Sequence, residues 1–164
     1  MMGKKHTISI LVDNQPGVLQ RVAGLFSRRG YNIDSITVGE SEEPGLSRMV
    51  IVTTGDEKTV EQISKQLYKL VNVLKVVDLS ANPMVDRELA LIKIVADPAS
   101  RSEVLSVVET FRAAVVDIGS TTMMIQVVGD PGKVDAMIDL LKPYQIREIS
   151  RTGITAMTRG TISK

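Results

Sequence analysis

Two patterns of hydrophobic residues, one typical of strands and one typical of helices, alternate along the first half of the chain. Short runs rich in β-branched residues, which are typical of strands, cover His6–Val12, Asn32–Val38, Met49–Thr53 and Val73–Leu79. After the first run, apolar residues recur at helical spacing from residue 18 to residue 26. Pro16 suits the first turn of that helix and Gly30 its end. Asp56 precedes a second helical pattern, so the predicted order of elements is βαββαβ.

The second half repeats this order. Strand patterns cover Leu89–Val95, Ala114–Ile118, Met123–Val128 and Ile146–Ile149, and Ile154–Met157 is expected to extend the sheet. Ser100 and Glu103 have the spacing of a capping box before one helical pattern. Asp130 and Pro131 precede the other helical pattern.

The two patterns predict an α+β fold of two ferredoxin-like βαββαβ modules. Each module would be a four-stranded antiparallel sheet with helices on one face. The expected boundaries are residues 1–80 and 84–164, joined by a linker at Ala81, Asn82 and Pro83. The halves barely match in sequence, so the repeat is one of structure.

Composition adds a constraint on how such modules are stabilised. The chain has 164 residues with 43% apolar and only 3% aromatic side chains, so the cores must be aliphatic. Two small modules would each be marginal alone, which favours further burial by self-association.

Charge and cysteine content exclude several classes of protein. The net charge is +1 and is balanced between the halves, so nothing attracts nucleic acid or an anionic membrane. The absence of cysteine excludes disulfides and thiolate metal sites. The first residues lack a secretory pattern and no run is long enough for a membrane span. We therefore expect a cytoplasmic protein.

Candidate catalytic residues are few. His6 is the one histidine and is interpreted as a packing or edge residue. Asp13 and Asp34 could be proposed as a carboxylate pair, but turn chemistry explains both. No phosphate-binding or dinucleotide motif is present, and the strands lack the exposed aromatics that stack RNA bases. We expect no catalytic site and no metal or cofactor site in this chain.

The segment from Asp13 to Leu19 (DNQPGVL) predicts a different kind of site. A strand end, a tight turn and a helix start bring unpaired backbone N–H groups together, and these favour an anion such as a carboxylate. Gly17 would let a ligand approach the backbone. Asn14 supplies both a carbonyl and an amide.

This segment resembles the opening of an ACT domain, an amino-acid-binding βαββαβ module. NQPGVLQRVAGLFSRRGYNI, LSRMVIVTTGD and QLYKLVNVLKVVDL resemble the small subunit of acetolactate (acetohydroxyacid) synthase, and RELALIKI and EISRTGITAMTRG resemble its carboxy-terminal half. The resemblance spans nearly the whole chain.

The resemblance implies a regulatory role. Members bind valine or a related branched-chain amino acid between two ACT domains of a homodimer, and they activate a separate catalytic subunit that carries thiamine diphosphate, Mg²⁺ and FAD. The implied site residues are Asn14, Gln15, Pro16, Gly17, Val18 and Leu19 from one protomer and Asn32 and Ile33 from the other. The turns of the second module lack this arrangement, so we expect that module to serve assembly.

Two alternatives stay open at this point. The first is a free-standing amino-acid-responsive regulator that has no catalytic partner. The second is a small ferredoxin-like hydrolase of acyl phosphates, which would need an arginine placed in an anion-binding loop. The segment from Asn14 to Leu19 contains no arginine, so the second alternative ranks last.

Overall fold

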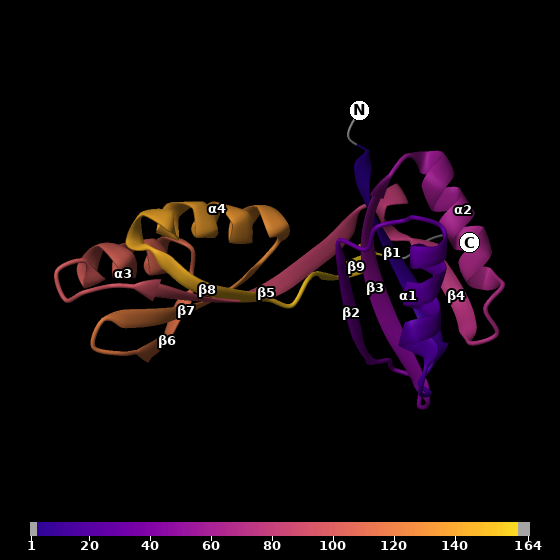
Figure 1. Cartoon of the computed structure of the whole chain (residues 1–164), viewed down its shortest axis with the longest axis horizontal. Coiled ribbons are helices and arrows are strands. Elements are labelled where there is room, and N and C mark those ends of the chain that lie inside the picture. The colour runs from indigo at the N-terminus through magenta and orange to yellow at the C-terminus, as the bar shows by residue number, and fades with distance from the viewer. Residues whose placement is uncertain (1–2, 161–164) are drawn as a thin grey trace. The chain divides into compact units, whose positions relative to one another are not determined.

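The computed structural model of the chain describes residues 3–160 and divides into two compact units. Residues 3–85 and 155–160 form the first unit, and residues 86–154 form the second. The second unit is therefore inserted, along the chain, between two parts of the first. Figure 1 shows the elements of each unit.

The first unit has the predicted βαββαβ order. Its elements are β1 (Lys4–Asp13), α1 (Val18–Arg28), β2 (Ser35–Glu40), β3 (Leu46–Gly55), α2 (Glu57–Tyr68), β4 (Val73–Asp78) and the short 3₁₀ helix η1 (Leu79–Ala81). The sheet order is β2-β3-β1-β4 with antiparallel neighbours. This is the ferredoxin-like topology, so the fold prediction is confirmed for this unit.

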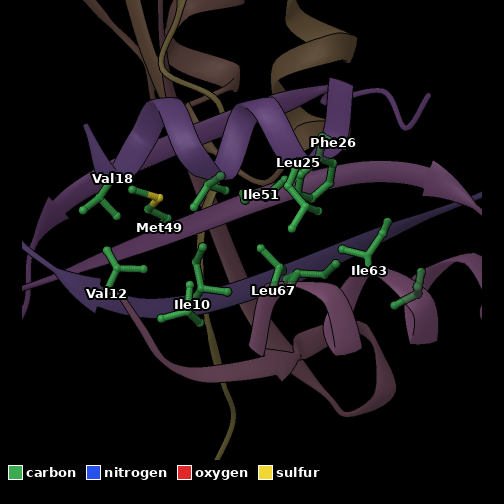
Figure 2. Close-up of a cluster of buried hydrophobic side chains, with 13 residues drawn as sticks. Ile10, Val12, Val18, Leu25, Phe26, Met49, Ile51, Ile63 and Leu67 are labelled. Atoms are coloured by element: carbon green, nitrogen blue, oxygen red, sulfur yellow. The ribbon is translucent and has the colours of Figure 1, made fainter. Parts of the chain in front are cut away.

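An aliphatic core lies between this sheet and its two helices (Figure 2). Alternate residues of β1 point into it, which follows from the two-residue period of a strand. Its buried members are Ile8, Ile10, Val12, Val18, Val22, Leu25, Phe26, Met49, Ile51, Val60, Ile63, Leu67 and Val73. The helical spacing of the α1 members explains why α1 packs along the sheet.

The strand β9 (Thr155–Thr158) belongs to the first unit. It pairs with β5, and the Arg159 N–H donates to the Pro83 carbonyl at 2.9 Å. Ala156 is buried with Val50 and Leu79. The sequence pattern predicted a strand here, but a strand pattern does not identify the residues against which the strand packs.

The second unit repeats the topology of the first. Its elements are β5 (Met84–Val95), α3 (Arg101–Thr110), β6 (Ala114–Ile118), β7 (Thr122–Gly129), α4 (Pro131–Leu141), the 3₁₀ helix η2 (Lys142–Tyr144) and β8 (Ile146–Arg151). The sheet order is β6-β7-β5-β8. Ala90, Ile92 and Ile94 of β5 face the core that α3 and α4 cover. Both modules are thus ferredoxin-like, as predicted.

Two details of helix starts differ from the predictions. Pro16 lies outside α1, which begins at Val18 after Gly17. Ser100 and Glu103 form no capping box. The Ser100 hydroxyl bonds Asp97, and the Glu103 carboxylate accepts the hydroxyl of Tyr144 at 2.9 Å. In both cases neighbouring loop contacts override a local sequence signal.

Candidate functional site

The start of α1 has no side-chain cap. Gly17 occupies the N-cap position in the left-handed conformation, with φ 86°, and has no side chain to accept a backbone N–H. The Val18 N–H donates to the Gln15 carbonyl over a long 3.4 Å. Within residues 3–160, the N–H groups of Gly17, Leu19 and Gln20 have no acceptor. Unpaired amides and the helix dipole together make this end favourable for an anion.

The loop before α1 is held by backbone hydrogen bonds at its beginning. The Asp13 N–H donates to the Asn72 carbonyl and the Asn14 N–H to the Gly45 carbonyl, both at 2.9 Å. The side chains of Asn14, Gln15 and Pro16 are exposed. Within the described residues, the Asn14 side-chain amide has no protein partner, so it is available to a ligand.

Two hydrophobic site candidates in α1 have different surroundings. The Val18 side chain is 3% exposed and packs in the core beside Val12 and Met49 (Figure 2). Leu19 is 47% exposed on the helix surface. Val18 can therefore meet a ligand only through its backbone, whereas the Leu19 side chain is free to contact an aliphatic group.

Asn32 and Ile33 lie at the opposite end of the same sheet. The Asn32 carbonyl accepts the Thr53 hydroxyl at 2.6 Å, and Thr53 pairs with His6 near the beginning of β1. The α1 loop instead follows the end of β1. The Asn32 side chain bonds Asp34, and Ile33 packs against the core of its own unit. A single copy of the chain therefore does not bring all eight predicted residues together.

The carboxylates considered as a pair are also separated. Asp13 ends β1 and accepts the Asn72 amide at 3.3 Å, while Asp34 accepts the Thr54 hydroxyl at 2.6 Å at the other end of the sheet. Turn and strand-end contacts explain both residues, as expected.

His6 is buried, and its Nε2 lies 3.1 Å from the Gly55 carbonyl, as expected of a packing residue. It lines an open cavity of about 450 Å³ with Lys4, Glu57, Glu61, Asp78 and Ser80. That cavity lies at the β1 end remote from Gly17. In residues 3–160 no group of three or more acidic or histidine side chains is placed to hold a metal ion. Every helix in this part of the chain is too short or too polar to span a lipid bilayer.

Comparison with known families defines the class of the first unit. Residues 8–75, which contain the whole α1 loop, match the family described as the ACT domain of acetohydroxyacid synthase small subunits. Residues 87–160 match the family described as the small subunit of acetolactate synthase. The fold and the open α1 start thus belong to an ACT module.

The relatives extend this result to the full chain. The acetolactate synthase small subunit of Bacillus subtilis is 50% identical over 161 residues, covering 98% of this chain and 94% of the relative. A probable acetolactate synthase small subunit of Methanothermobacter thermautotrophicus is 51% identical, over 95% and 94%. The crystal structure of this subunit from Thermotoga maritima superposes with a TM-score of 0.89 at 51% identity, over 97% and 99% of the two chains.

The chain belongs to the family of acetolactate synthase small subunits. Members of this family are regulatory subunits of acetolactate synthase, a transferase whose name implies a role in branched-chain amino acid synthesis.

Proposed function

We propose that this chain binds valine, or a related branched-chain amino acid, at the start of α1 and thereby makes acetolactate synthase subject to feedback inhibition. The observation that carries the proposal is the uncapped helix start at Gly17. A helix end with unpaired N–H groups receives a carboxylate, which every amino acid carries.

The surrounding groups suit the rest of such a ligand. The N–H groups of Gly17 and Val18 would donate to the carboxylate, with the weak Val18–Gln15 bond giving way. The exposed Asn14 amide would meet the polar end, and Leu19 would contact the aliphatic side chain. Because one methylene in an apolar pocket is worth only about 1–3 kcal/mol, leucine and isoleucine would bind with different strengths.

The second half of the site would come from a second copy of the chain. β2 is an edge strand with β3 as its neighbour in the sheet. Its last residue, Glu40, pairs with Ser47, which pairs with Val12 just before the α1 loop. If two β2 strands pair antiparallel, the beginning of one lies beside the end of the other. This arrangement would bring Asn32 and Ile33 of the second copy to the α1 loop of the first.

The regulatory role has a thermodynamic requirement. The chain would activate a thiamine-diphosphate-dependent catalytic subunit in the cytoplasm, and valine would inhibit only by binding the inhibited state of the complex more tightly than the active one. A coupling free energy of about 1–3 kcal/mol would give feedback of the usual size.

Isothermal titration calorimetry of the purified chain tests the proposal, with valine, leucine and isoleucine as ligands. We expect saturable valine binding near one ligand per protomer. A parallel assay with the catalytic subunit should show activation without valine and inhibition with it. An absence of valine binding to the chain, together with a valine-insensitive reconstituted enzyme, would contradict the proposal.

A further inference from the structure

Asn72 makes an unusual set of contacts next to the proposed effector loop. It lies in the turn between α2 and β4 and is 8% exposed. Its carbonyl accepts the Asp13 N–H at 2.9 Å, and its Nδ2 donates to the Asp13 carboxylate at 3.3 Å. Its Oδ1 accepts from the guanidinium of Arg21.

These contacts reach both ends of the loop that carries Asn14 and Gly17. Asp13 is the last residue of β1, immediately before the loop, and Arg21 lies in the first turn of α1, immediately after it. One buried side chain therefore fixes where the loop begins and where the helix starts. An amide suits the position because it donates and accepts at once. A carboxylate could not donate to Asp13, and an aliphatic side chain could do neither.

We propose that Asn72 is the positioning residue that holds the Asn14–Gly17 loop in its ligand-binding conformation. The inference rests on the proposed function of that loop. Asn72 itself need not touch the ligand. It acts by keeping the free amides of α1 and the side chain of Asn14 in a fixed relation, so that less ordering is required on binding.

The test is the valine affinity of Asn72→Ala, which removes both side-chain contacts and leaves the backbone bond to Asp13. We expect the dissociation constant for valine to rise about five- to tenfold. Activation of the catalytic subunit should be unchanged. Asn82→Ala is the matched control, because Asn82 is an exposed asparagine of the same unit, and its affinity should equal that of the unchanged chain.

A reciprocal exchange separates positioning from general loss of stability. Asp13→Asn combined with Asn72→Asp swaps donor and acceptor, and the new carboxylate still accepts from Arg21. We expect this double variant to recover valine affinity to within about twofold. The single Asn72→Asp variant places two carboxylates together, so it should bind as weakly as Asn72→Ala.

The outcomes distinguish this inference from the proposed function. If the unchanged chain binds no valine, the proposed function fails and the inference fails with it. If the unchanged chain binds valine and Asn72→Ala binds equally well, the inference alone is overturned. If Asn72→Ala fails to fold, the double variant Asp13→Asn, Asn72→Asp tests the inference instead. A folded double variant that binds valine weakly overturns the inference, and one with restored valine affinity supports it.

Discussion

The two units begin the first helix of the same topology in different ways. In the first unit Gly17 leaves the start of α1 without a side-chain cap. In the second unit Ser100 likewise gives α3 no side-chain cap, but Asp97 accepts the N–H of Ser100 at 3.0 Å and its hydroxyl at 2.9 Å. Arg101 then donates to the carbonyls of Gly119 and Ser120 in the turn between β6 and β7.

The comparison shows that a shared topology does not fix the surroundings of the first helix. In both units the turn before the first helix lies against the turn of a hairpin, β2–β3 in the first unit and β6–β7 in the second. The first unit joins them by one backbone bond, from Asn14 to Gly45. In the second unit the Ala96 N–H makes the corresponding bond to the Thr121 carbonyl at 2.9 Å, and the guanidinium of Arg101 adds hydrogen bonds to the carbonyls of Gly119 and Ser120. Local sequence therefore decides which side chains lie beside each helix start: Asp97 and Arg101 at α3, and none of this kind at α1.

The other two helices, α2 and α4, begin at capping aspartates. Asp56 accepts the Thr59 N–H at 2.7 Å at the start of α2, and Asp130 accepts the Lys133 N–H at 2.8 Å at the start of α4. Neither α1 nor α3 has a side-chain cap, but within residues 3–160 α1 is the one α-helix with no aspartate accepting a backbone N–H at or just inside its N-cap. At α1 an external carboxylate could supply what α2 and α4 obtain from Asp56 and Asp130.

The largest expected effect comes from closing the open start with Gly17→Asp. Among the described residues no atom lies within 4 Å of an added Cβ, so the side chain fits, although φ of 86° costs about 1–2 kcal/mol for a residue with a side chain. The new side chain would add bulk and negative charge beside the amides and repel the carboxylate of the ligand. Calorimetry should show valine affinity reduced at least about 100-fold, with activation of the catalytic subunit retained.

Gly160→Asp is the control for backbone strain and charge. Gly160 has φ of +65° and equally open surroundings, at a place remote from α1 in the chain. Its valine affinity should match that of the unchanged chain. Full valine sensitivity in Gly17→Asp would show that the ligand binds elsewhere.

A smaller effect is expected from opening the second turn with Arg101→Ala. The substitution removes charged hydrogen bonds to the carbonyls of Gly119 and Ser120. We expect the free energy of unfolding of the second unit to fall by about 2 kcal/mol, as measured by denaturant titration. Valine affinity and stoichiometry should not change. A loss of valine binding would mean that the second turn contributes to the effector site.

The smallest expected effect is on the pH dependence of stability that Asp97 contributes in the same turn. Hydrogen bonds from the Ser100 side chain and backbone lower the pKa of Asp97 below its ordinary value. Its stabilising contribution is therefore present above the ordinary carboxyl pKa and is lost as the pH falls through the lowered value. Thermal unfolding of Asp97→Asn should lose less stability on acidification than that of the unchanged chain. An identical acid dependence would contradict this assignment.

Sequence reasoning predicted most of the fold because hydrophobic period and turn residues agree in both halves. The strands, their order and the Asp56 and Asp130 caps follow from local patterns. Features that depend on distant contacts could not be found this way. The packing of Ala156 in the first unit and the replacement of the expected Ser100 capping box by contacts to Asp97 are of this kind.

The candidate site was likewise only partly accessible from sequence. The Asn14–Leu19 segment has a local signal, a strand end followed by proline, glycine and a helix. The burial of the Val18 side chain could have been inferred from its place in the apolar stripe. The contacts of Asn72 could not, because they join residues 51 and 59 positions apart in the chain.

The most direct test of the central claim compares the two turns in one experiment. Two-dimensional ¹H–¹⁵N NMR spectra of the chain would be recorded while valine is added. We predict saturable shifts of the Gly17, Val18 and Leu19 amide resonances, with those of Ser100 and Arg101 unchanged. Saturable shifts confined to the second turn, or to other parts of the chain, would contradict the assignment of the effector site to the open start of α1.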